Sequence, residues 1–512
     1  MKSRRLTVIL SLAMPVIVVI FFWRYWDFTQ DDAYIPLRYA MHFLQGEGWV
    51  YNPGEWVEGY TSPLQLVLLT VLTAFGVSGV VAGKWLGVIA WGVCIILVAK
   101  WLAYVSWKVK GGAFAFLIGM MLLGANRSVV LWAVSGLETL LFTTLLTAAT
   151  GAVWWALSRG RVSFWYGILI ATLFFLATMA RPEGALFAVV MLSAGIFFSA
   201  DKVIKINWIG AIVHYLLLLM VFLLWRYDTY HAWLPNTFYA KLWANPFPEN
   251  IRAGAVYFLN FLFSAPFIGA LFMLAVPSAH HFRTWRVPEW TIAGAVMLYI
   301  FYTIYAGGDW MENLRFYIPI MPLCIILIVI SIVRLPQWIR PVLPWASVGV
   351  LVLCLLQFIA QPVYVQLGAA ETYWRCMAGY IHQHWPKSSL IALNMAGVIP
   401  YYAPDYRYLD MLGLNDAHIA RQRAFQQVAS SDMPFAVAHS KGDPAYILHR
   451  APDYIIPGGG MAGDAPVYAA EKLLLEMPEF HALYAFHTEA LTCLYRGVER
   501  PYTFTYFQRM KK

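Results

Sequence analysis

The 512-residue sequence predicts a polytopic α-helical membrane protein of about eleven spanning helices, followed by a small α/β domain. The chain is 61% hydrophobic and only 12% charged, whereas a soluble domain is close to half apolar and a quarter charged. Apolar runs of near-membrane length recur along residues 1–360. Basic residues fall in short pairs between these runs, as they do where charge orients membrane helices.

A membrane-spanning helix takes about 20 apolar residues. The runs that meet or approach this length are 7–24, 82–106, 112–126, 138–157, 163–179, 184–200, 207–226, 256–278, 290–306, 315–333 and 341–360. The first run follows Lys2, Arg4 and Arg5 and lacks a small-x-small cleavage site. We therefore expect an uncleaved helix whose N-terminus is cytoplasmic.

The short apolar segment 63–77 decides the topology, because counting it as a span reverses every later loop. If 63–77 does not span the membrane, all the basic pairs lie in the cytoplasm. If it does span, they all lie outside, against the positive-inside rule. We therefore expect 63–77 to lie at the outer interface or to re-enter the membrane there. The basic pairs are Lys108 with Lys110, Arg159 with Arg161, Lys202 with Lys205, Arg283 with Arg286, and Arg334 with Arg340. The segments expected outside are 25–81, 127–137, 180–183, 227–255 and 307–314.

Composition divides the chain into a membrane domain, 1–360, whose first outward loop is 25–81, and an extracytoplasmic domain, 361–512. The second domain is less apolar and richer in turns. Its pattern predicts buried strands at Leu390–Leu393, Tyr408–Met411 and Tyr454–Pro457, with helices at 369–384 and 415–428. The net charge of +9 follows from the scattered topological pairs and does not indicate a nucleic-acid-binding patch.

Cysteine and histidine usage indicates no metal site. Cys94, Cys324 and Cys354 lie in apolar runs and read as small core residues. Cys376 and Cys493 both fall in the second domain, where they either pair, if that domain is exported, or stay reduced. No C-x-x-C occurs, and the His-x-His at 382–384 has no third ligand near it in the sequence.

The first outward loop holds the strongest candidates for chemistry. Asp31 and Asp32 are adjacent carboxylates, so either the pKa of one is raised or both need a cation or hydrogen-bond donors. The alternative is a solvated turn that caps the next helix. Four further residues of the loop are predicted to bind substrate beside the acids: Arg38, Tyr39, Glu58 and Tyr60.

The later outward loops supply further predicted substrate-binding residues. Arg181 lies outside against the charge rule, which suggests that it binds an anion. Gly307 and Gly308 let the backbone approach a ligand closely. The alternative to substrate binding is a structural role. The acids would then stabilise the starts of helices, and the aromatic residues would form an interfacial belt. The full set is Glu138, Arg181, Glu183, Asn236, Lys241, Asp309 and Arg315.

The order of these motifs resembles the GT-C glycosyltransferases, membrane enzymes that use sugars linked to polyprenyl phosphate. Asp31-Asp32-Ala-Tyr-Ile and Glu58-Gly-Tyr-Thr-Ser-Pro resemble their first outward loop. Nearly the whole chain resembles the AftB-like group of mycobacterial arabinofuranosyltransferases. The resemblance implies a short interfacial helix before the second span and a catalytic carboxylate at Asp31 or Asp32. The later motifs that carry it are Ser135–Glu138, Arg181–Gly184, Leu234–Asn236, Gly307–Asp309, Arg315–Phe316 and Leu412–Asp416.

We therefore expect an inner-membrane glycosyltransferase of the cell envelope, with its active site on the periplasmic side. It would move a sugar, arabinofuranose or another pentose or hexose, from polyprenyl phosphate to a glycan or glycolipid acceptor. In an inverting displacement Asp31, with Asp32 a close second, is the general base. Arg181, Lys241 and Arg315 would stabilise phosphate charge. A divalent cation at Asp31 or Asp32 stays open, and no nucleic-acid partner is expected.

Three other functions are the alternatives. A transporter or flippase for lipid-linked glycans should show ionisable residues or broken helices near the membrane centre, whereas the polar clusters here gather at one face. An oligosaccharide ligase or polymerase is not separated from a glycosyltransferase by this sequence. A scaffold with a C-terminal binding domain would leave the paired acids unexplained.

Overall fold

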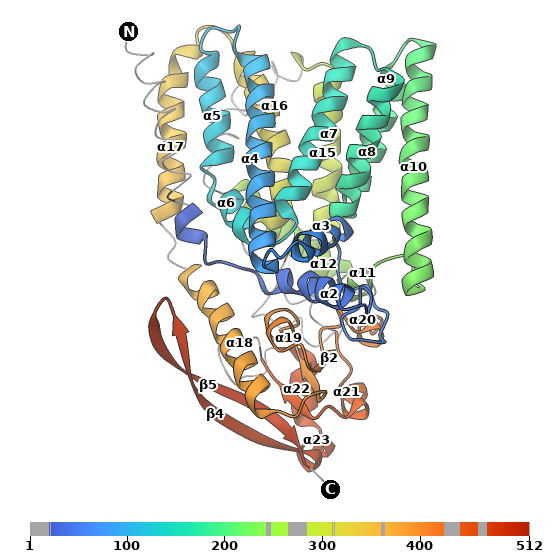
Figure 1. Ribbon diagram of the computed structural model, residues 1–512. Coiled ribbons are helices and arrows are strands. Elements are labelled where there is room, and N and C mark those ends of the chain that lie inside the picture. Colours follow the sequence, from blue (N-terminus) through green and yellow to red (C-terminus); the bar gives the residue numbers. More distant parts are fainter. Residues whose placement is uncertain are drawn as a thin grey trace. The chain divides into compact units, whose positions relative to one another are not determined.

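The computed structural model describes residues 20, 22–241, 247–264, 284–309, 311, 313–359, 364–423, 441–458 and 468–510 (Figure 1). The chain divides into two compact units, and each unit is built from three separate stretches of the sequence. The first comprises residues 1–27, 84–223 and 254–362, and the second comprises 28–83, 224–253 and 363–512. The predicted segment 7–24 and the end of 256–278 lie largely outside the described residues.

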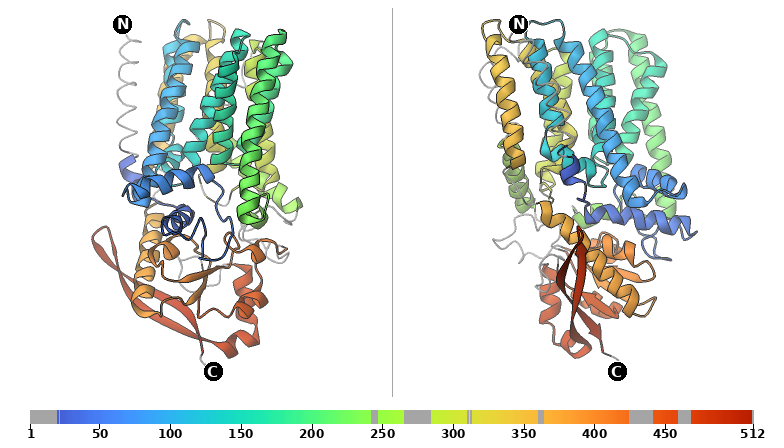
Figure 2. Two further views of the ribbon diagram at one scale, coloured as in Figure 1. Left: turned by 45° about the vertical axis from the view of Figure 1, so that its right-hand side comes forward. Right: turned by 60° about the vertical axis from the view of Figure 1, so that its left-hand side comes forward.

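The first unit is a bundle of apolar helices (Figures 1 and 2). Its helices are α4 (Gly79–Ser106), α5 (Gly112–Gly124), α6 (Arg127–Val134), α7 (Thr139–Arg159), α8 (Phe164–Ala180), α9 (Gly184–Phe198), α10 (Lys202–Tyr230), α12 (Phe247–Leu262), α15 (Val287–Tyr305), η2 (Arg315–Ile320), α16 (Met321–Val333), η3 (Arg340–Val342) and α17 (Leu343–Ile359). α4, α10 and α12 each have one end assigned to the second unit.

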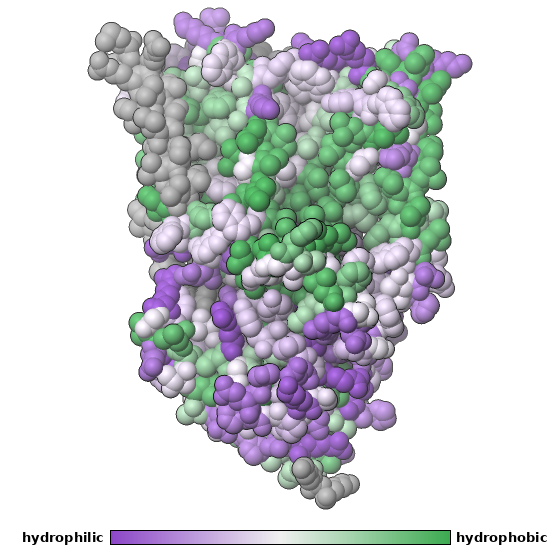
Figure 3. Space-filling model, in the orientation of Figure 1, coloured by the Kyte–Doolittle hydropathy of each residue, from purple (hydrophilic) through white to green (hydrophobic). Residues whose placement is uncertain are grey.

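Several of these helices are apolar on every side, which occurs in a buried helix or in one that faces lipid. Residues 315–333 form the buried kind, whereas Leu216, Leu217 and Val221 of α10 are more than half exposed. Hydrophobic residues accordingly predominate over the visible helices of this unit, and hydrophilic residues gather at their ends (Figure 3). This surface suits a bilayer.

Among the described residues, six helices are long and apolar enough to span a membrane, or seven if the bent pair of α5 and α6 is one span. Every predicted run that lies wholly within these residues forms a helix, but α8 and α9, of 17 and 15 residues, fall short of the length criterion. The described residues therefore establish a multi-pass membrane protein, while the count of eleven stays a prediction.

The bent pair differs from the sequence prediction of one helix followed by an outward loop at 127–137. α5 and α6 meet at 44°. The side chain of Asn126 accepts hydrogen bonds from the backbone N–H groups of Ser128 and Val129, which starts α6 in a new direction. Most of the expected loop is therefore a buried helix.

The second unit is built on a five-stranded sheet of order β2-β1-β3-β5-β4. β1 (Leu390–Leu393) pairs in parallel with β2 (Arg407–Asp410) and β3 (Tyr454–Ile456), while β5 (Val498–Arg509) is antiparallel to β3 and to β4 (Tyr484–Tyr495). The three predicted strands are confirmed; the β4–β5 hairpin was not predicted. The helices of this part are α18 (Tyr364–His384), α19 (Val398–Tyr402), α20 (Ala417–Ala420), α21 (Pro444–Arg450), α22 (Ala469–Glu476) and α23 (Pro478–Leu483).

The first outward loop belongs to this second unit. It forms η1 (Asp31–Ala33), α2 (Tyr34–Leu44) and α3 (Pro63–Ala74), and α2 packs against both α3 and α19. Ile35, Tyr39 and Tyr60 share one hydrophobic core with Ile391 and Leu393 of β1. The compact unit therefore contains more than residues 361–512.

The helix expected over 63–77 is α3. Pro63 occupies its first turn, and the Ser62 hydroxyl accepts the N–H of Gln65. Val67, Val71 and Phe75 form an exposed apolar stripe at a spacing of four residues. This stripe suits the interfacial placement, which stays a prediction.

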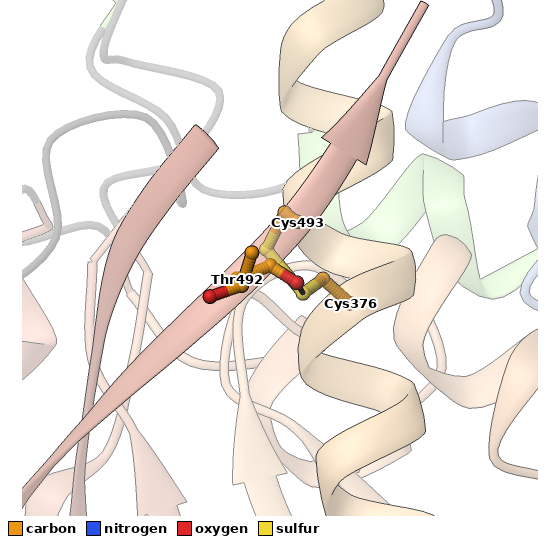
Figure 4. Close-up of a disulfide and its surroundings, with 3 residues drawn as sticks. All are labelled: Cys376, Thr492 and Cys493. Carbon is orange, nitrogen blue, oxygen red and sulfur yellow. Dashed lines mark hydrogen bonds between the residues drawn. A yellow bond between two sulfur atoms is a disulfide. The ribbon is translucent and has the colours of Figure 1, made fainter. Parts of the chain in front are cut away.

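Cys376 of α18 and Cys493 of β4 form a disulfide, with their Cα atoms 5.7 Å apart (Figure 4). The pairing that the sequence left open is therefore present. It fastens the long hairpin to α18, while Cys94 and Cys354 are buried and reduced.

Candidate functional site

Asp31 is anchored by the C-terminal part of the chain. Its carboxylate accepts hydrogen bonds from the backbone N–H groups of Gly397, at 3.0 Å, and Val398, at 2.7 Å, where α19 begins. A Cβ on Gly397 would lie 1.9 Å from the carbonyl oxygen of Asp31, so only glycine permits this approach. Both oxygens of Asp31 thus have structural partners.

Burial raises the pKa of Asp31 to about 7, the two N–H donors oppose that rise, and the charges of Asp32 and Asp410 add to it. Asp32 differs from its neighbour. Both side chains are partly exposed, but that of Asp32 makes no hydrogen bond or ion pair to any residue that the structure describes. One acid of the pair is therefore fixed in place, and the other is available to a ligand.

Asp410, at the end of β2, is a third acid near this pair. It accepts hydrogen bonds from the backbone N–H groups of Leu412, at 3.0 Å, and Asn415, at 2.9 Å, and from the Asn415 side chain at 2.9 Å. Burial raises its pKa to about 6. Asn236 steadies the same loop, because its Nδ2 lies 2.9 Å and 3.0 Å from the carbonyl oxygens of Gly413 and Leu414.

Tyr468 and Glu471 complete this acidic neighbourhood. The charges of Glu471, Asp31 and Asp32 all raise the pKa of the Tyr468 hydroxyl, after the larger effect of its burial. Glu471 is buried and accepts the backbone N–H of Gly458 at 2.7 Å. The sequence interpretation missed Asp410, Tyr468 and Glu471. Of these three, only Asp410 could have been found from the sequence, since it lies two residues before the Leu412–Asp416 motif.

Arg38, predicted to bind substrate, instead fastens the backbone. It is fully buried and donates to the carbonyl oxygens of Tyr51, at 2.8 Å, Tyr406, at 3.0 Å, and Pro400. Its guanidinium lies 5.2 Å and 4.9 Å from the ring centres of Tyr51 and Tyr408. The carbonyl oxygens thus bind the edges of the guanidinium and the tyrosine rings cover its faces, so Arg38 presents no surface to a substrate.

Tyr39 is also buried, and its hydroxyl donates to Val57 O at 2.7 Å and accepts from Gly59 N at 2.9 Å. Tyr60 contacts the hydroxyl of Tyr230 at 2.9 Å. Of these two predicted substrate-binding tyrosines, Tyr39 thus hydrogen-bonds the backbone on either side of Glu58, and Tyr60 connects the same segment to Tyr230.

Glu58 has a partner that the sequence interpretation missed, Arg226. Nε of Arg226 lies 2.7 Å from one carboxylate oxygen of Glu58, and Nη2 lies 3.1 Å from the other. Burial nevertheless raises the pKa of Glu58 to about 7, because the desolvation of the carboxylate outweighs the charge of Arg226. Arg226 closes an apolar run, so only its place in the fold shows its role.

In the first unit, Glu138, Arg181 and Glu183 form a buried ion triad. Arg181 Nη1 lies 2.6 Å from Glu138, and its Nη2 and Nε lie 2.8 Å and 3.2 Å from the two oxygens of Glu183. The structure brings these three predicted residues together, with Tyr302 hydroxyl 3.5 Å from Glu183. The guanidinium of Arg181, which was predicted to bind phosphate, is therefore already paired with two carboxylates.

Asp309 and Arg315 form a second closed pair in this unit. Arg315 Nε and Nη2 lie 2.6 Å and 3.2 Å from the two oxygens of Asp309. The rings of Trp132 and Phe316 lie 5.7 Å and 5.3 Å from the guanidinium carbon. Nε and Nη2 of Arg315 are thus engaged by Asp309, just as all three guanidinium nitrogens of Arg181 are engaged by glutamates.

Lys241 ends α11 (Asn236–Lys241) and is partly exposed. Within the described residues there is no group of three or more His, Cys, Asp or Glu side chains placed to hold a metal ion. A divalent cation at Asp31 or Asp32 therefore stays a proposal. His382 faces Asp405, with 3.7 Å between Nδ1 and Oδ2.

The fold has solved counterparts. ArnT from Cupriavidus metallidurans bound to undecaprenyl phosphate matches with a TM-score of 0.53 at 11% identity, over 78% of this chain and 85% of that chain. The apo form of that ArnT matches at 0.50 and 11% identity, over 99% and 98%. The chain has the GT-C fold.

The fold class and the GT-C resemblance expected from the sequence are thereby confirmed. The arabinofuranosyltransferase AftD from Mycobacteria shares this GT-C fold with a TM-score of 0.52 and 14% identity. The match covers 98% of this chain but only 40% of AftD. Residues 364–505 match a family described as a domain of unknown function (DUF8728). No curated protein matches the sequence.

Proposed function

We propose that this GT-C chain transfers a sugar from polyprenyl phosphate to an acceptor hydroxyl on the extracytoplasmic face of the inner membrane. Support comes from two solved counterparts, one bound to undecaprenyl phosphate and one named an arabinofuranosyltransferase. The observation that carries the proposal is the division between the acids of the first loop: Asp31 is fixed, and Asp32 is available.

In this mechanism Asp32 is the general base. It takes the proton of the acceptor hydroxyl while the acceptor oxygen attacks the anomeric carbon. The bond from that carbon to the phosphate oxygen breaks, polyprenyl phosphate leaves with the electron pair, and the configuration inverts. Asp31 positions its neighbour through the N–H groups of Gly397 and Val398. This proposal favours Asp32, the close second of the sequence interpretation, over Asp31.

The disulfide supports the orientation. Disulfides persist in oxidising compartments, and Cys376 and Cys493 lie in the unit that also holds Asp31 and Asp32. The positive-inside pairs point the same way. The sugar in this proposal is arabinofuranose or another pentose or hexose, and the acceptor is a glycan or glycolipid.

The experiment compares Asp32→Asn, Asp31→Asn and the exposed control Glu47→Gln, each purified in detergent, in sugar transfer from a synthetic polyprenyl-phosphate donor. Loss of a general base lowers the rate by about 10²–10⁴-fold, so Asp32→Asn should lose this much while its thermal unfolding stays parental. Asp31→Asn should reduce both rate and stability, because an amide cannot accept both N–H bonds. Parental transfer by Asp32→Asn would refute the proposed base.

A lipid-linked-glycan flippase is the alternative, because α5 and α6 meet at a 44° bend and broken helices occur in transporters. The two functions differ in their products. Proteoliposomes with a labelled polyprenyl-phosphate sugar and an outside acceptor should yield a new glycosidic bond. Movement of the intact donor between leaflets, with no transfer, would favour the flippase.

A further inference from the structure

The hairpin of β4 and β5 is much longer than the sheet that carries it. Its strands pair from Tyr484 with Arg509 to Tyr495 with Val498, whereas β3 pairs only with Gln508 and Phe507. The half that approaches the turn is therefore a two-stranded arm, which is marginally stable alone. Packing on α18 and the disulfide from Cys376 to Cys493 hold it in place.

The arm runs toward the start of α18. Phe504, nearer the sheet, contacts Tyr380, whereas Tyr502 stacks on the earlier residue Tyr373 with 4.8 Å between ring centres. Beyond the disulfide the turn is about 10 Å further along the strand, and the first residue of α18 is about 18 Å further along the helix. The turn thus lies beside the first turns of α18, as the views in Figures 1 and 2 show.

The start of α18 is tied to the membrane by the covalent chain. Residues 340–357, which include most of α17, form a candidate span, and α17 ends at Ile359. α18 begins at Tyr364. Five residue steps reach at most about 18 Å. The arm therefore ends within reach of the bilayer surface from which this span emerges.

The turn has the chemistry of a membrane interface. Arg496 and Gly497 both have positive φ, as the two-residue turn of a tight hairpin requires. Leu494 and Val498, beside this turn, are 65% and 55% exposed. The guanidinium groups of Arg496 and Arg500 lie 5.5 Å and 6.0 Å from the ring centre of Tyr495. Exposed apolar side chains beside two arginines suit the headgroup region, and the turn also carries the exposed acid Glu499, which pairs with Leu494. Figure 3 shows hydrophobic residues among hydrophilic ones at this end of the hairpin.

We propose that the turn of the β4–β5 hairpin is a membrane anchor that rests on the outer surface of the bilayer. Leu494 and Val498 enter the boundary between headgroups and acyl chains, and Arg496 and Arg500 bind lipid phosphates. The anchor would hold the unit that carries Asp31 and Asp32 at a set height above the lipid. This inference does not depend on the reaction proposed above.

The test places the photoreactive residue benzoylphenylalanine at position 494 of the full-length protein, in bilayer discs of phosphatidylcholine and phosphatidylglycerol. Thr488 is the matched control, because it is exposed and lies on the same face of the same strand, about 20 Å further from the turn. Lipid adducts found by mass spectrometry should be several-fold more abundant at 494 than at 488. Equal labelling at both positions, or adducts at 494 only to protein, would overturn the proposal.

The charge-reversal variant Arg496→Glu with Arg500→Glu provides a second measurement, and the exposed residue Lys472, changed to Glu, serves as its control. The double reversal should lower the lipid labelling at 494 and the Lys472 variant should not. An intact disulfide and parental thermal unfolding would show that both variants are folded. Unchanged labelling at 494 in the double variant would refute the role of the arginines.

Discussion

The acid pair of the first loop and the ion clusters of the helical bundle look alike in sequence but differ in structure. Both lie in segments expected to face outward, and both concentrate charge. Asp32 is partly exposed without a partner among the described residues, whereas Arg181 and Arg315 are buried against carboxylates. A charged residue at membrane depth needs a partner of opposite charge or hydrogen bonds. The sequence pattern does not show whether a substrate or another part of the protein supplies that partner.

The physical reason is the free energy of desolvation. A buried ion is stable only when its partner and its hydrogen bonds are complete, so removal of one partner is costly, whereas removal of both can be neutral. Arg181 with its two glutamates and Arg315 with Asp309 meet this condition. We therefore expect substitutions in the bundle to affect stability first and substitution of Asp32 to affect turnover first.

The largest expected effect on stability is that of Arg181→Met. It leaves Glu138 and Glu183 buried without their cation, which should lower the free energy of unfolding by about 3–5 kcal/mol. Thermal unfolding in detergent measures this loss, with Asp32→Asn as the variant expected to unfold like the parent. If Arg181→Met unfolds like the parent but uses the donor poorly, the arginine binds phosphate, as the sequence interpretation predicted.

A smaller effect should follow in a double-mutant cycle at Asp309 and Arg315. Arg315→Met alone leaves a buried aspartate unpaired and should destabilise the protein clearly. The double variant Asp309→Leu with Arg315→Met removes both charges and should recover most of that loss. Additive losses in unfolding temperature would mean that the two side chains do not act as a pair.

A third comparison concerns pH. The pKa values of Asp31 and Glu58 are raised to about 7, and that of Asp410 to about 6. The folded state therefore binds more protons than the unfolded state between the ordinary carboxyl pKa and these values. The stability that this uptake contributes is full below the unfolded pKa and is lost as the pH rises through about 6 to 7.

The unfolding temperature should thus fall from acidic to mildly alkaline buffer, and Glu58→Gln should make that fall shallower. Glu47→Gln, which changes an exposed glutamate, should keep the parental slope. A slope unchanged in Glu58→Gln would show that Glu58 stays ionised across this range beside Arg226.

Much of the architecture was determined by local sequence features. Apolar length and basic pairs predicted the helices of the bundle, and short buried patterns predicted β1, β2 and β3. The order of the outward motifs indicated the GT-C fold, and the domain that contains Cys376 and Cys493 was identified as the place where they could pair. Each of these features depends on neighbours within one helix, strand or loop, so the sequence displays it directly.

Only the tertiary structure decided how the charges are used. Arg226 lies near the end of α10 and meets Glu58, 168 positions away in the chain. Arg38 donates its hydrogen bonds to carbonyl groups of distant segments. Gly397 and Val398 donate hydrogen bonds to Asp31 and not to Asp32, so the two neighbouring acids differ in their contacts. The first loop and the terminal sheet share one core for the same reason: long-range packing chooses among many partners, and no local pattern records the choice.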